Sequence, residues 1–239
     1  MHKFVNFIPF IQFLPAGRKP VLRFAASLWV IMSLVACSGL PDLPVTDESY
    51  RIWARYQEQL HAINSWQIHA RAVIFVGREV YQVGINWQRE IDQFVIVIEA
   101  PFGPGVFRLE TNQQAEGLPP IKLSMPDGQI LFDESAEVLL TRVLGWSFPV
   151  SGLKSWIKGL PLADPDYSFE LQADGRLKSL QQDDWVINYL EYFTRDAAAK
   201  GLPRKMYLKH QNLAVKIVIE RWRQFEATAN SPVFFPEFN

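Results

Sequence analysis

Side chains that could carry out acid–base, nucleophilic or metal chemistry are few and scattered in this 239-residue sequence. Beyond residue 36 the histidines are His61, His69 and His210, too far apart in the chain for a local metal motif. The carboxylate pairs Asp183–Asp184 and Glu134–Glu137 fall in a predicted turn and at a predicted helix start, where acidic residues serve capping. There is no Walker loop, dinucleotide fingerprint or G-x-S-x-G elbow. We therefore expect no catalytic residue, no metal and no cofactor.

The only cysteine, Cys37, lies in a context that predicts a modification. The residues before it, Leu34 to Ala36, resemble a bacterial lipobox, and they end an apolar run that follows basic residues. Such a short run is typical of a secretory signal and not of a membrane span. We predict a lipoprotein signal peptide over 1–36 and acylation of Cys37. The alternative is an anchor helix with a buried cysteine, and the role of residues 1–17 stays open.

The net charge indicates which class of partner is disfavoured, and the residue after Cys37 indicates in which membrane the protein is anchored. Residues 1–36 carry four basic and no acidic side chains, so the remainder has 20 basic and 25 acidic groups. This acidic balance disfavours nucleic acid as a partner. An aspartate directly after the lipidated cysteine resembles an inner-membrane retention signal in Gram-negative bacteria, so Ser38 indicates the outer membrane. We expect residues 37–46 to be a lipidated tether and 47–239 to be a single domain.

Hydrophobic spacing predicts a β-rich fold. Helical spacing over 47–62 is followed, from Trp66 on, by alternation. A pair of short helices is predicted within 133–161. The predicted strands, joined by short links that favour antiparallel pairing, are 66–76, 80–87, 92–100, 106–111, 121–125, 129–132, 167–172, 177–182, 185–193, 205–210 and 213–222. A sheet of this size must curl into a barrel or a half-barrel closed by helices. Its interior is expected to be either filled or hollow enough for lipid.

The segment APFGPGVF (100–107) joins two predicted strands and contains an unusual residue. Pro101 and Gly103 are typical of a turn. Phe102 between them places a bulky apolar side chain where a turn tip should meet water.

The segment VLGWSFPVSGLKSWIKGLP (143–161) carries a family resemblance. It is similar to the helical segment of the outer-membrane lipoprotein receptor family LolB, with its pattern G-x-x-x-P…L-x-x-W-I-x-G-L-P. The matching residues are Gly145, Pro149, Leu153, Trp156, Ile157, Gly159, Leu160 and Pro161. Segments 82–90 and 184–192 also resemble strands of that family, so the resemblance extends over the chain after Cys37.

The resemblance implies an incomplete antiparallel β-barrel of about eleven strands, with a helical lid enclosing an apolar cavity. It implies a receptor that accepts triacylated lipoproteins from the periplasmic carrier LolA and deposits them in outer-membrane lipid. Residues Pro101, Phe102 and Gly103 match the family's protruding loop, expected to insert into the membrane. The alternative is that Phe102 folds back onto the barrel as a plug. The cavity or lid candidates are Trp66, Ile68, Trp87, Ile96, Leu153, Trp156, Ile157 and Trp185. We expect a monomer anchored through Cys37 at the periplasmic face.

Two other classes of function stay open at this point. One is a structural or assembly lipoprotein that holds a protein partner through surface aromatics, without lipid transfer. The other is a lipid-modifying enzyme on the same scaffold, which would turn over an ester or phosphodiester. A receptor should take up a hydrophobic fluorescent probe that acylated peptide then displaces, whereas an assembly lipoprotein should take up no probe and present a flat apolar patch instead. The aromatic tail 225–239 has no periodicity and receives no assignment.

Overall fold

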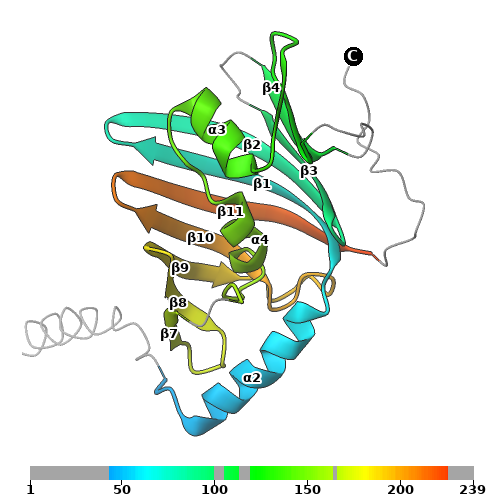
Figure 1. Cartoon of the computed structure of the whole chain (residues 1–239). Coiled ribbons are helices and arrows are strands. Elements are labelled where there is room, and N and C mark those ends of the chain that lie inside the picture. Colours follow the sequence, from blue (N-terminus) through cyan, green and yellow to red (C-terminus); the bar gives the residue numbers. More distant parts are fainter. Residues whose placement is uncertain (1–42, 100–104, 113–118, 164–165, 226–239) are drawn as a thin grey trace, which may run out of the picture. The chain divides into compact units, whose positions relative to one another are not determined.

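A computed structural model describes residues 43–99, 105–112, 119–163 and 166–225 (Figure 1). Contacts separate Met1–Asp42 from a second unit that begins at Leu43. Cys37 and the predicted loop residues Pro101, Phe102 and Gly103 lie outside the described residues. The fold described below is therefore that of the second unit.

Eleven antiparallel strands form one sheet, as the alternation predicts. They are β1 (Ser65–Val76), β2 (Glu79–Glu90), β3 (Gln93–Glu99), β4 (Val106–Thr111), β5 (Ile121–Ser124), β6 (Ile130–Asp133), β7 (Tyr167–Leu171), β8 (Leu177–Gln182), β9 (Trp185–Tyr192), β10 (Pro203–His210) and β11 (Leu213–Gln224). Their order in the sheet is β6-β5-β4-β3-β2-β1-β11-β10-β9-β8-β7. In the part of the chain that the structure describes, β6 and β7 do not pair, so the sheet is open.

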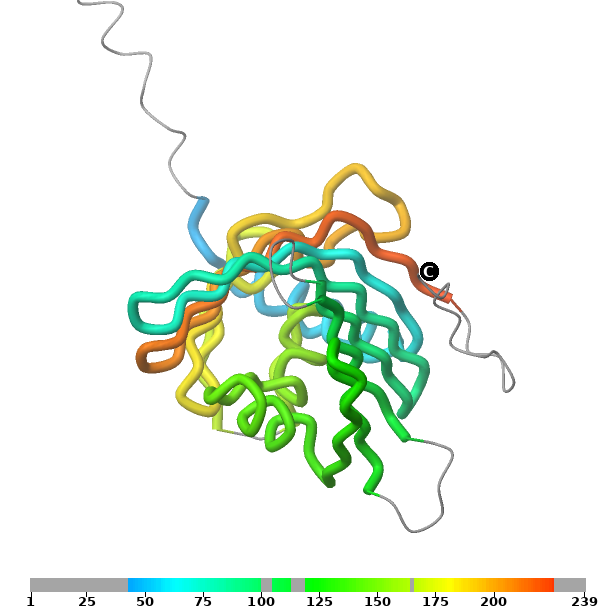
Figure 2. Tube along the Cα trace, turned by 90° about the horizontal axis from the view of Figure 1, so that it is seen from above, coloured from blue at the N-terminus to red at the C-terminus, as the bar shows by residue number. Residues whose placement is uncertain are grey.

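Two short helices connect the edges of this open sheet. The helices α3 (Ala136–Leu144) and α4 (Val150–Trp156) follow β6 and precede β7, as predicted for a helical pair within 133–161. Because β6 and β7 are opposite edges, the connection must cross the sheet. Figure 2 shows that it crosses the concave side, with the sheet curled around it. The helices thereby cover the interior.

The helix α2 (Asp47–His61) precedes β1 and begins at the N-cap Thr46. Its buried residues are Ser49, Trp53 and Leu60. The Ser49 hydroxyl donates to the carbonyl of Ala173 at 2.8 Å. Tyr50 has the helical spacing of an apolar stripe with Trp53 and Leu60, but it is 54% exposed. The stripe passes through the small Ser49 instead, because the helix start lies directly against the backbone at Ala173.

The strand β1 lies at the centre of the sheet and shows its alternation most clearly. Trp66, Ile68, Ala70 and Ala72 are all buried on the concave side. The register with β11 shifts between His69 and Ala70, where β11 holds one extra residue, a bulge that increases strand bending. At one end the β1–β2 and β10–β11 hairpins meet, since the Gly77 N–H donates to Asn212 O at 3.1 Å. We call this the hairpin end, and the opposite end, next to α2, the α2 end.

Candidate functional site

A cavity of about 30 Å³ lies between the concave face and the helices α3 and α4, and its wall is entirely apolar. Sheet residues contribute from alternating positions, because only every second side chain faces inward. The lining residues are Ile68, Ala70, Ile85, Trp87, Ile96, Ile98, Leu109, Leu140, Phe148, Val150, Leu153, Ile157 and Ile217. The volume fits about one water-sized group, so the interior of this conformation is nearly filled.

All eight residues proposed from the sequence as cavity or lid candidates are buried in one apolar cluster. Five of them line the cavity: Ile68, Trp87, Ile96, Leu153 and Ile157. The other three, Trp66, Trp156 and Trp185, are buried away from it. Sequence reasoning missed the lining residues of α3 and β11, Leu140 and Ile217, because local spacing does not show which distant segments face each other.

Tryptophans fill the α2 end of the interior. The ring centroids of Trp66 and Trp87 lie 5.0 Å apart, and those of Trp66 and Trp222 lie 5.3 Å apart. The indole N–H groups of Trp66 and Trp87 are buried without a hydrogen-bond partner among the described residues. Edge-to-face ring contacts stabilise such pairs. This end of the interior is therefore closed by aromatic packing.

The end of α4 is fixed to the sheet by hydrogen bonds. Trp156 Nε1 donates to Gln182 Oε1 at 3.1 Å, and the N–H of Leu162 donates to the same oxygen at 2.7 Å. The Tyr189 hydroxyl donates to Trp156 O at 2.9 Å, and burial raises the pKa of Tyr189. A Cβ on Gly152 would lie 2.6 Å from the Trp156 ring, so this position requires glycine. The α4 end of the lid is therefore rigidly attached.

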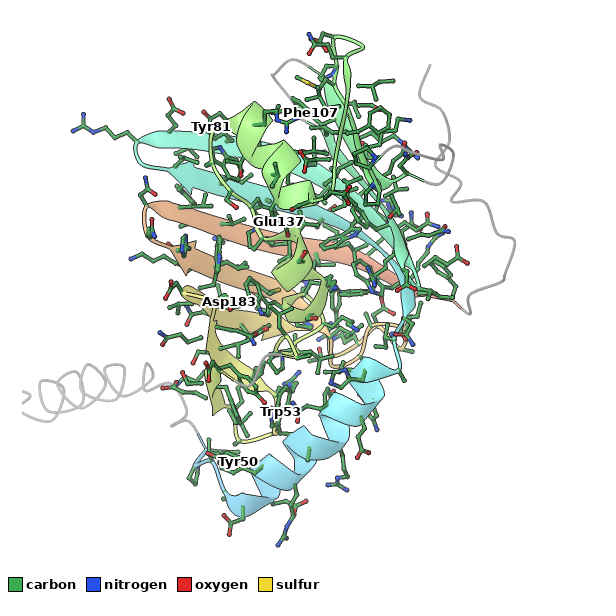
Figure 3. All side chains as sticks on the ribbon, viewed as in Figure 1. Tyr50, Trp53, Tyr81, Phe107, Glu137 and Asp183 are labelled. Carbon is green, nitrogen blue, oxygen red and sulfur yellow. The ribbon has the colours of Figure 1, made fainter. Side chains whose placement is uncertain are left out.

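Glu137 joins the two lid helices (Figure 3). Its Oε1 accepts from the N–H of Ser151 on α4 at 2.7 Å, and its Oε2 accepts from the Ser135 hydroxyl at 2.9 Å. Burial acts to raise the pKa of Glu137, but these hydrogen bonds bring it below its usual value. The sequence placed Glu137 at a helix start in a structural role, which the contacts confirm. Ser135 is the N-cap of α3.

Two cations lie at the α2 end of the interior. Lys158 Nζ donates to the carbonyls of Leu60 and Ile63 at 3.3 and 3.1 Å, which connects α4 to the end of α2. Burial, together with the positive charges of Arg89 and Lys154, lowers the pKa of Lys158 to about 8. Burial also lowers the pKa of Arg89. Charging Lys158 therefore opposes the folded state.

This predicts a pH dependence of stability. Between pH 8 and about 10.5 folded Lys158 loses its proton while the unfolded chain keeps it. The unfolded state then binds more protons, so the free energy of unfolding rises with pH. Relative to Lys158→Met, the wild type should gain about 1–2 kcal/mol across this window, a value reduced for partial exposure. Urea unfolding of both proteins between pH 7 and 10 measures it, and a constant difference would contradict it.

The groups that could carry chemistry are not brought together. His61 is exposed, His69 is half-buried on β1, and His210 stacks on Trp185 with 5.1 Å between centroids. Among the described residues no three His, Cys, Asp or Glu side chains gather as a metal site would require. Asp183 and Asp184 have φ of 50° and 62° and form the β8–β9 turn, as the sequence predicted. No described helix is long and apolar enough to cross a bilayer.

The described fold is thus an open antiparallel sheet curled around an apolar interior, with the helices α3 and α4 on its concave side. A family model described as "Outer membrane lipoprotein LolB" matches residues 64–222. The chain belongs to this family of non-enzymatic receptors that act in outer-membrane lipoprotein localisation. The resemblance of segment 143–161 and the outer-membrane localisation are thereby confirmed. The assembly-lipoprotein and enzyme alternatives are set aside.

Curated relatives match along most of their length. Outer-membrane lipoprotein LolB of Nitrosococcus oceani is 32% identical over 202 residues, which cover 84% of this chain and 97% of the relative. Outer-membrane lipoprotein LolB of Pseudomonas aeruginosa is 32% identical over 204 residues, covering 84% and 95%. Among solved structures, the LolA superfamily protein NE2245 from Nitrosomonas europaea has a TM-score of 0.43 and 9% identity, covering 72% of this chain and 93% of that one.

Proposed function

We propose that this protein accepts triacylated lipoproteins from the carrier LolA and inserts them into the outer membrane, with the acyl chains bound beneath α3 and α4. The wholly apolar wall of the cavity carries this proposal. Acyl chains have no groups that form hydrogen bonds, so they are unfavourable in water. A wall without polar groups can bind them without leaving any polar group unpaired. Each methylene removed from water contributes about 0.8 kcal/mol, so three chains need extensive apolar cover during transfer.

The interior must open for this role, because a cavity of about 30 Å³ holds no acyl chain. We propose that α3 moves. Its principal contacts in the sheet are with β5 and β6 near one edge, whereas α4 is attached at its end through Trp156 and Gln182. Displacing α3 exposes the cavity wall from β1 to β4, and an acyl chain then replaces the apolar contacts that the helix gives up.

Transfer from the carrier must run downhill in affinity, because the sequence has no nucleotide-binding motif to drive it. For deposition we propose that Phe102 enters the lipid interface from the loop Pro101–Gly103, which joins β3 to β4. Burial of a phenylalanine is worth about 1.5–3 kcal/mol, enough to hold the cavity mouth transiently at the bilayer. Acylated Cys37 would keep the protein at the outer membrane as a monomer.

A transfer experiment with a chain that begins at Ser38 tests the proposal. LolA loaded with a triacylated lipoprotein is mixed with it, and the cargo bound to each protein is measured after separation. We expect the cargo to pass to this chain, and a hydrophobic fluorescent probe to enter it and be displaced by acylated peptide. If neither cargo nor probe binds, acyl binding beneath α3 and α4 is wrong.

A further inference from the structure

Three neighbouring strands in the middle of the sheet carry a surplus of positive charge. The strands β1, β10 and β11 together contain seven lysine and arginine residues but a single carboxylate, Glu220. This balance is opposite to that of the chain after residue 36, which has 20 basic and 25 acidic groups. We call the seven residues the cationic band: Arg71, Arg204, Lys205, Lys209, Lys216, Arg221 and Arg223.

The cations of β11 point away from the interior. The buried Trp222 separates Arg221 from Arg223, and Lys216 likewise lies between two buried residues of the strand. Since successive side chains of a strand point to opposite faces, these three cations lie on the convex side. All three are exposed. The strand β11 lies between β1 and β10 in the sheet, so the band follows the middle of the convex face.

Carboxylates neutralise only part of the band. Glu220 pairs with Arg71 at 2.5 Å. Glu191 of β9 pairs with Arg204 and, at 3.0 Å, with Lys205. The band residues that have no ion-pair partner among the described residues are Lys209, Lys216, Arg221 and Arg223. Charges of one sign on one face repel each other, and an anionic partner relieves this repulsion.

The neighbouring His69 shows that the positive field is not cancelled locally. Burial lowers the pKa of His69 below its usual value, and the charges of Arg221 and Arg223 lower it further. A hydrogen bond with Asn86 and the charge of Glu220 act in the opposite direction without restoring the pKa. The single carboxylate of these strands therefore does not offset the two arginines beside it.

We propose that the cationic band binds the anionic headgroups of a phospholipid bilayer, with the convex face of β1, β11 and β10 against the membrane. From Lys216 to Arg223 the band extends roughly 20 Å along β11, and the three strands span about 10 Å. A surface of this extent fits a layer of headgroups and not one small anion. A curled sheet (Figure 2) touches a flat surface along a line parallel to its strands, and the cations follow such a line.

A bilayer is the extended surface that a protein of this family always has beside it, because the family is one of outer-membrane lipoproteins. The binding does not depend on the transport of cargo. Its consequence rests on the proposed function: α3 and α4 lie on the concave side (Figure 2), so they would face away from the bilayer. The cover of the cavity would then face the aqueous phase from which the carrier arrives.

Vesicle binding by a chain that begins at Ser38 tests the proposal, since the compact unit begins at Leu43. Sedimentation is measured with vesicles of phosphatidylcholine alone and with vesicles of which about one third is phosphatidylglycerol. We expect binding to the anionic vesicles to be at least about tenfold stronger, and salt should weaken it through screening. Combining Lys216→Gln, Arg221→Gln and Arg223→Gln should remove this difference. No cargo is present, so failure here is distinct from failure of lipoprotein transfer.

The matched control removes three exposed cations elsewhere, by Arg51→Gln and Arg55→Gln on α2 and Lys178→Gln on β8. It changes the net charge equally and should bind anionic vesicles as the wild type does.

Three results would overturn the proposal. The first is equal binding of the wild type to the two kinds of vesicle. The second is equal loss of binding in both triple variants, because net charge alone would then explain it. The third is a band variant that keeps its vesicle binding but no longer accepts cargo from LolA, because an acidic protein surface would then be the partner of the band.

Discussion

Phe102→Glu is expected to leave the acceptance of cargo from LolA unchanged and to reduce its deposition into liposomes about 10- to 100-fold. This range corresponds to losing the burial of one phenylalanine at the lipid interface, about 1.5–3 kcal/mol. A carboxylate at the loop tip adds a cost, since a charge does not enter the interface without desolvation. The cavity wall is not touched, so acyl binding persists. Lipoprotein bound to the chain and lipoprotein recovered with liposomes are measured separately.

The controls separate membrane contact from packing. Phe102→Leu keeps an apolar tip and should retain most of the deposition. Val186→Glu places the same charge at an exposed apolar position on β9 and should change neither step. If Phe102→Glu impairs neither step, the loop makes no membrane contact that matters for transfer. If it lowers the Tm and impairs both steps, the phenylalanine folds back onto the barrel as a plug.

The elements of the fold were predictable because each rests on local chemistry. Alternation over Trp66 to Val76 requires a strand with one buried face, and β1 covers those residues. The Ser135 cap and Gly145 at φ 78° delimit α3, and both are local signals of a helix start and a helix end. The left-handed backbone at Asp183 and Asp184 fits a tight hairpin turn. None of these features depends on residues far away in the chain.

The composition of the site was only partly predictable, for the same reason. Ile85 and Ile98 follow from the alternation that places Trp87 and Ile96 inside, once β2 and β3 are paired. Ile217 lines the cavity because β11 pairs with β1, across a separation of more than a hundred residues that no local pattern reports. Arg89 is directly opposite Trp66 on the concave side. The charge of Arg89 favours a position exposed to water, but the residue lies at the α2 end of the interior beside Lys158.

Ala70→Phe is expected to have the opposite effect from Phe102→Glu: loss of cargo acceptance, with membrane contact preserved. Ala70 is 4% exposed and lines the cavity from the central strand, where the small side chain leaves the space beneath α3 and α4. A phenyl ring fills more than the 30 Å³ available, so it occupies the volume that an acyl chain must enter. Overpacking of this kind costs about 1–3 kcal/mol of stability. We expect affinity for acylated peptide to fall at least about tenfold, which is 1.4 kcal/mol.

Ala214→Phe is the matched control, because this substitution adds the same ring away from the cavity. Ala214 lies on the outer face of β11, where it pairs with Phe75. It should bind acylated peptide as the wild type does, and liposome association through the loop should persist in both variants. If Ala70→Phe folds and still accepts cargo normally, the acyl chains do not enter beneath α3 and α4. Because Phe102→Glu and Ala70→Phe act at different places, the two phenotypes together decide whether acceptance and deposition are separate steps.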